Sequence, residues 1–154
     1  MKPYAKGFVL VAPYAATDGD TDTGADTMDC KGFSFAQINI IAGTAANTTK
    51  HVSLSVTECD SSNGTFESIV ALTGTTNTST STSAGFCIPQ ACTAGGTQKW
   101  TMMMDIDLKK RKRFLKLNYE IGTNQTFAAF ALLGKAAELP YTYTKAGVNV
   151  LAQV

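Results

Sequence analysis

Hydrophobic and polar residues alternate on both sides of a short basic segment in the second half of the chain. Before it, one face carries Trp100, Met102, Met104, Ile106 and Leu108, and after it the apolar positions are Leu115, Leu117, Tyr119 and Ile121. A period of two is typical of strands that bury one face. The pattern predicts two antiparallel strands joined by a protruding basic tip, which consists of Lys109, Lys110, Arg111, Lys112 and Arg113.

The remaining chain reads as further short strands separated by turn residues. Expected strands or extended segments cover 6–14, 33–40 with a bulge near Ala36 and Gln37, 52–56, 66–72, 86–89 and 127–133, the last central in a sheet. Residues 16–30 are expected to form a polar loop, and Thr75–Ser83 a flexible one. About eight strands without a convincing amphipathic helix predict an all-β fold, a jelly-roll-like β-sandwich.

The composition supports this class. Of 154 residues, 44% are hydrophobic and 16% charged, which suits one packed domain rich in strands and turns. We expect a single domain over 1–154, with an N-terminal arm and acidic loop at 1–30 and an extended C-terminal arm at 135–154. The apolar runs are too short for a signal sequence or a membrane span, so we expect no membrane partner.

Two groups of residues raise the question of metal binding. The acidic loop has the D-x-D-x-D spacing of a calcium loop, but its glycine is displaced and a bidentate glutamate is absent; its members are Asp18, Asp20, Asp22, Asp26 and Asp29. We expect a solvated acidic surface there. The four cysteines, Cys30, Cys59, Cys87 and Cys92, lack the paired spacing of a zinc site and are expected to be free thiols.

No arrangement of residues predicts catalysis. His51 is the only histidine and falls on the polar side of its expected strand, without the partners that a nucleophilic triad needs. No glycine-rich phosphate loop and no nucleic-acid module accompany the basic tip. We therefore expect a protein that is not an enzyme, has no cofactor and does not bind nucleic acid.

The order of several segments resembles the small capsid decoration, or cement, proteins of tailed bacteriophages. The sharpest element is the basic segment with its flanks, DIDLKKRKRFLKL at 105–117; weaker ones are DCKGF at 29–33, SVTECD at 55–60 and ALLGKA at 131–136. The resemblance covers about residues 26–140. It implies a homotrimer on the outer face of an icosahedral shell, bound to the major capsid protein, without catalysis or cofactor. Such a protein belongs to the virion surface and is assembled in the host cytoplasm.

We expect some of the five basic side chains at 109–113 to face acidic groups on a neighbouring subunit or, as the resemblance implies, on the shell. Arg111 and Arg113 are the best suited to specific pairs, and the alternative is a solvated turn. Phe33, Phe35 and Met102–Met104 offer apolar surface for a trimer. Two alternatives stay open. One is a glycan-binding adhesin domain, for which Trp100, Tyr4, Tyr14, Tyr141 and Tyr143 could supply aromatic contacts; the other is a tail-tube or head–tail subunit of a phage.

Overall fold

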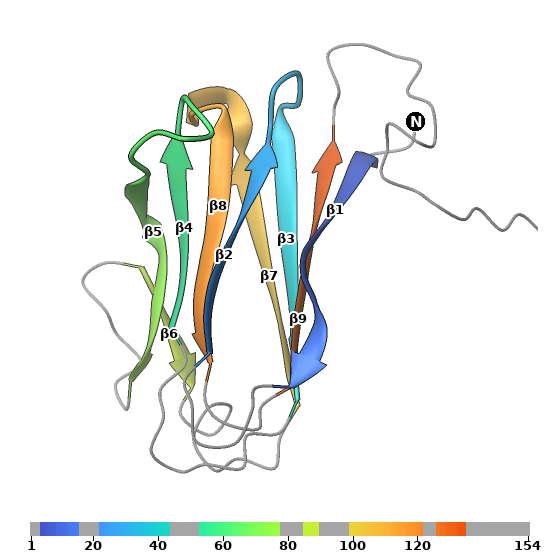
Figure 1. The fold of residues 1–154 in the computed structure, drawn as a ribbon, viewed down its shortest axis with the longest axis vertical. Coiled ribbons are helices and arrows are strands. Elements are labelled where there is room, and N and C mark those ends of the chain that lie inside the picture. Colours follow the sequence, from blue (N-terminus) through green and yellow to red (C-terminus); the bar gives the residue numbers. More distant parts are fainter. Residues whose placement is uncertain are drawn as a thin grey trace, which may run out of the picture.

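A computed structural model describes residues 4–15, 22–43, 53–77, 85–89, 99–121 and 126–134. They form nine strands: β1 (Tyr4–Ala15), β2 (Asp22–Asp29), β3 (Phe35–Ala42), β4 (Ser53–Cys59), β5 (Glu67–Asn77), β6 (Phe86–Pro89), β7 (Trp100–Asp107), β8 (Phe114–Ile121) and β9 (Thr126–Gly134). One 3₁₀ turn, η2 (Leu108–Lys110), follows β7. The strands build two sheets that lie face to face (Figure 1).

The order of the strands is that of a jelly roll. Sheet A has the order β1-β9-β3-β7, and sheet B has the order β2-β8-β4-β5-β6. Four antiparallel pairs are nested in the sequence: β1 with β9, β2 with β8, β3 with β7, and β4 with β5. Such nesting arises when one long hairpin rolls into a sandwich. The predicted all-β, jelly-roll-like fold is confirmed, with β6 added in parallel beside β5.

The core lies between the two sheets and follows the alternation of the sequence. In β3 every second residue, Ala36, Ile38, Ile40 and Ala42, is buried, and β4 and β9 repeat the pattern. Sheet B contributes Met28, Leu54, Val56, Leu115 and Leu117 from the opposite side. Burying an isoleucine or leucine side chain stabilises the fold by about 1.5–3 kcal/mol, so these two inner faces hold the sheets together.

The predicted hairpin around the basic tip is wrong. β7 pairs with β3 in sheet A, whereas β8 pairs with β2 and β4 in sheet B. The basic segment is therefore a connection that crosses from one sheet to the other (Figure 1). Period-two alternation identified both strands correctly, but alternation carries no information on which strand is the neighbour.

The N-terminal region is predicted only in part. Residues 4–15 form β1, an integral strand of sheet A, so the strand expected at 6–14 is confirmed in place of an arm, whereas Asp22–Asp29 form β2 of sheet B in place of a polar loop. The bulge expected near Ala36 and Gln37 is absent from β3, whose register with β7 and β9 is continuous. β5 extends to Asn77, into the expected flexible tract. As predicted, β9 is an inner strand, between β1 and β3. The C-terminal arm, 135–154, lies outside the described residues.

Candidate protein-binding surfaces

The connection from β7 to β8 closes one end of the sandwich. Asp107 accepts a hydrogen bond from the Lys109 backbone N–H at 3.0 Å, and Leu108, the first residue of η2, is buried against the core. The Leu108 N–H donates to the Ser34 carbonyl at 3.1 Å, which ties the connection to the turn between β2 and β3. That turn contains Gly32 in the left-handed region, at φ 83°, where glycine carries no steric penalty. Leu108 and the backbone thus anchor the basic segment on the fold.

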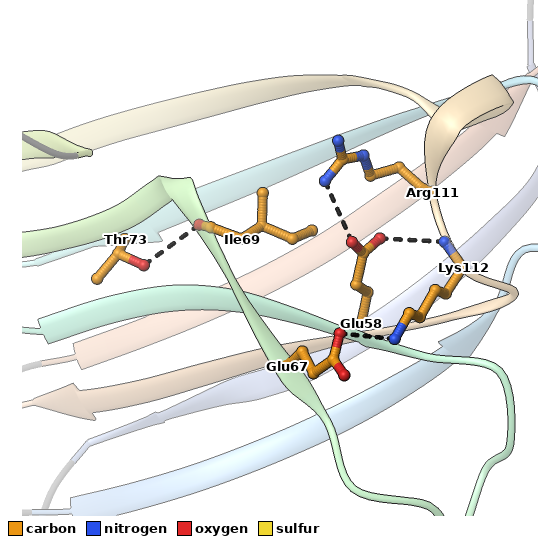
Figure 2. Close-up of polar contacts among 6 residues, drawn as sticks. All are labelled: Glu58, Glu67, Ile69, Thr73, Arg111 and Lys112. Atoms are coloured by element: carbon orange, nitrogen blue, oxygen red, sulfur yellow. Dashed lines mark hydrogen bonds and ion pairs between the residues drawn. The ribbon is translucent and has the colours of Figure 1, made fainter.

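Glu58 accepts hydrogen bonds from Arg111 and Lys112, in the middle of the connection between β7 and β8 (Figure 2). It lies near the end of β4, opposite the buried Leu115, and its side chain is 15% exposed. One carboxylate oxygen accepts from Arg111 Nη1 at 3.3 Å, and the other accepts from the Lys112 backbone N–H at 3.0 Å. A poorly hydrated carboxylate needs such donors, so Arg111 and Lys112 satisfy Glu58 within the same chain.

Two further ion pairs attach the segment to sheet B. Lys112 Nζ lies 2.6 Å from Glu67 Oε2 (Figure 2), and that hydrogen bond raises the pKa of the lysine against some desolvation. Arg113 donates to both oxygens of Asp29, at 2.9 and 2.6 Å, in the forked geometry that suits a guanidinium, and the pKa of Arg113 is raised by these bonds. The Arg113 guanidinium also stacks on the Phe114 ring, 4.7 Å from its centre.

The five predicted interface residues therefore divide into two groups. Arg111, Lys112 and Arg113 pair with acidic residues of their own chain, which offsets the repulsion among them. Lys109 and Lys110 are exposed on η2, and in the described ranges no carboxylate pairs with either ammonium group. Contact of the segment with another protein stays a prediction, and these two lysines are its available cations.

The outer face of sheet A forms a second candidate surface, which we call the apolar face. Three large side chains on it are exposed: Ile41 of β3 by 51%, Met103 of β7 by 61% and Phe130 of β9 by 36%. Asn39 pairs with Met103 on one side and with Phe130 on the other, and Ile41 is two residues along the same face of β3. Cross-strand and diagonal neighbours in a sheet lie within about 8 Å, so the three residues form one patch around Asn39.

The outer face of sheet B is polar over the same span. Ser53, Ser55 and Thr57 of β4 lie beside Asn118 of β8, whose amide donates to Thr57 Oγ1 at 3.1 Å. Lys116 Nζ lies over the Phe66 ring at 4.0 Å. An exposed valine, Val70 of β5, lies in this sheet. The two outer faces thus differ in chemistry, and the apolar one has the composition of a protein contact.

Sequence reasoning found only part of the apolar face. Among the residues expected to form a trimer contact, Met104 is buried, and Met102 and Phe33 pack against the core. Only Met103 of that group is an exposed large residue, and the alternation of β7 would have placed it outward. Ile41 and Phe130 were missed, because β3 and β9 are apolar on both faces at these positions and periodicity alone cannot orient such strands.

The described residues contain no group of three potential metal ligands. Of the acidic loop, Asp26 is exposed on β2 and Asp29 pairs with Arg113, while Asp18 and Asp20 lie outside the description. Cys30 and Cys59 are buried thiols outside any disulfide, as predicted; the side chain of Cys87 and all of Cys92 are not described. His51, Tyr141 and Tyr143 also lie outside the described residues, and the side chains of Tyr4, Tyr14 and Trp100 are not described.

None of the helices in the described ranges is long and apolar enough to span a membrane.

Comparison with known proteins finds similar solved structures but no relative in sequence. No family model matches the chain, and no curated protein matches it in sequence. Among solved structures, the chain is similar to one described as the structure of infectious bursal disease virus Gx strain, with a TM-score of 0.45 and 10% identity over 92% of this chain. The chain spans 34% of that protein's length. It is also similar to a structure titled "CBM4 structure and function", with a TM-score of 0.38, 9% identity and 88% of each chain covered.

Proposed function

We propose that this chain is a non-catalytic structural protein of a phage virion, which binds the outer surface of the icosahedral capsid and stabilises it. The observation that carries the proposal is the contrast between the outer faces: sheet A exposes Ile41, Met103 and Phe130 together, whereas sheet B presents hydroxyl and amide groups. A rigid jelly roll with one apolar face is suited to binding protein. The resemblance of the basic segment and its flanks to capsid decoration proteins supplies the identity of the partner, the major capsid protein.

In this proposal the two candidate surfaces have different tasks. The apolar face supplies buried area, either against the shell or between copies of a homotrimer, because desolvating large side chains gives most of the affinity of a contact. Lys109 and Lys110 add attraction to acidic groups, which speeds and orients binding more than it strengthens it. Repetition over a symmetric lattice multiplies contacts that are weak singly.

The test is co-sedimentation of the purified protein with expanded, undecorated phage shells. The wild-type chain should saturate the shells and raise the temperature at which they disrupt. Replacing Ile41 and Met103 with serine should weaken binding by roughly 30-fold to 900-fold, if each side chain loses about 1–2 kcal/mol of burial.

Val70→Ser is the matched control, because Val70 is 59% exposed but belongs to sheet B. It should bind shells as the wild type does. If the Ile41→Ser/Met103→Ser variant binds shells as tightly as the wild type does, the apolar face is not part of the contact with the shell. Absence of binding to every shell tested, together with saturable binding to glycans, would replace the capsid proposal by the adhesin alternative.

A further inference from the structure

The four edge strands of the sandwich are protected to different extents. Unpaired edges can pair with other chains, and proteins block them with bulges, prolines, short strands or inward-pointing charges. β1 has three register shifts and contains Pro13; β6 has four residues and ends at Pro89. In β2, Asp26 pairs with the buried Leu117 and so occupies a core-facing position at the edge, where it is exposed. Each of these edges carries a recognised obstacle to pairing.

β7 has none of these obstacles. It is eight residues long, contains no proline and pairs with β3 in unbroken register. Its charged residues are engaged, since Asp105 accepts from Gln37 at 2.9 Å and Asp107 caps η2. The stretch Trp100–Met104 carries no charge, and no described strand pairs with its outer edge. Beside it, Met103 extends the apolar face to the margin of sheet A. β7 is thus the edge most open to an added strand.

The C-terminal segment of the chain has the pattern of such a strand. Val148, Val150, Ala152 and Val154 alternate with Asn149, Leu151 and Gln153, without proline or charge. β-branched residues in a period of two favour a strand. The seven residues Val148–Val154 are enough to pair along most of β7, which has eight residues.

The position where the described chain ends is compatible with this pairing. Gly134 pairs with Phe35, and Phe35 with Asp107, so the end of β9 and the end of β7 lie at the same end of sheet A (Figure 1). A strand beyond β7 would lie three spacings from β9, or about 14 Å. Residues 135–147 can span up to roughly 43 Å when extended. A chain that returns from this end runs opposite to β7, which gives the antiparallel arrangement.

We propose that Val148–Val154 pairs in antiparallel fashion with the outer edge of β7 in the same copy, as a fifth strand of sheet A. The short linker keeps the segment at a high effective concentration near this edge, which favours the same copy over a neighbour. The pairing would satisfy the outward backbone groups of Trp100–Met104 and cover the margin of the apolar face at Met103. It does not depend on the proposed capsid role, because the segment and the edge belong to one chain.

Amide hydrogen exchange, resolved by residue with NMR, tests the pairing. In the full chain, alternate amides of Trp100–Met104 should exchange roughly tenfold or more slowly than in a chain that ends at Glu138, because pairing shields them from solvent. Amides of β4 and β8 should exchange equally in both chains, which shows that the truncated protein is folded. A peptide of residues 141–154, added to the truncated chain, should restore the protection in a saturable way.

Two full-length variants separate pairing from other effects of the C-terminal segment. Val150→Pro removes an amide donor within the proposed strand and should lose the protection. Ala137→Pro, in the linker, should keep it. Equal exchange in the full and truncated chains would overturn the proposal. Protection that rises with protein concentration would also overturn it, because a segment from a second copy would then be the occupant.

Discussion

Lys109 and Lys110 lie next to Arg111, Lys112 and Arg113 in the sequence, yet the two groups have different surroundings. The lysines belong to η2, which projects at the end of sheet A, while the following three residues descend onto sheet B beside Glu58, Glu67 and Asp29. Three of the cations are therefore paired within the chain, whereas among the described residues no carboxylate pairs with Lys109 or Lys110. A run of like charge can thus divide into paired and solvent-exposed cations, according to the direction in which the backbone turns.

Among substitutions around the basic segment, the largest loss of stability is expected at Glu58. Glu58→Ala should lower the free energy of unfolding by about 1–3 kcal/mol, because the Lys112 backbone N–H and the Arg111 guanidinium lose a partly buried acceptor. Chemical denaturation measures it. Glu67→Ala is the matched control: its side chain is 68% exposed, so loss of its ion pair with Lys112 should reduce stability much less than Glu58→Ala does. Equal losses in both variants would show that burial of Glu58 does not distinguish the two contacts.

A smaller loss is expected when the Arg113–Asp29 pair is removed. Asp29→Ala breaks a bidentate but exposed pair, and it also removes the acceptor of the Lys31 N–H in the adjacent turn. We expect a loss smaller than that of Glu58→Ala in thermal or urea unfolding, reduced as salt is added. Asp26→Ala, on the same strand, serves as the control and should be close to neutral. A loss at Asp29 that is insensitive to salt would assign the effect to the turn instead of the ion pair.

The smallest effect on stability is expected for the two lysines. Lys109→Ser/Lys110→Ser should change the free energy of unfolding by less than about 0.5 kcal/mol, as is usual for surface positions. If these lysines face acidic groups on the shell, the same variant should slow shell binding at low salt, and the difference should vanish at high salt. Arg111→Ser/Lys112→Ser is the informative comparison, because it should reduce stability as well. Unchanged binding kinetics for the lysine variant would leave η2 as a solvated turn.

Much of the fold followed from alternation in the sequence. The strand after the basic segment was predicted with its buried positions Leu115 and Leu117, and β4 with Leu54 and Val56. The acidic stretch was not recognised as β2, because its aspartates and glycines favour turns; the strand forms through pairing of Asp22–Asp29 with β8, a neighbour some ninety residues away. Strand propensity depends on the local sequence, whereas the pairing of β2 with β8 depends on residues far away in the chain.

The sequence by itself determined the class of the fold, since the period of two and the turn residues allow little besides packed sheets. It also determined that the basic residues 109–113 form a connection between two strands. Only the tertiary structure decided that β7 and β8 lie in different sheets, that Glu58, Glu67 and Asp29 meet the basic segment, and that Ile41, Met103 and Phe130 share one face. The physical reason is that alternation specifies which side of a strand is buried, whereas neighbours across a sheet are chosen by contacts between residues far apart in the chain.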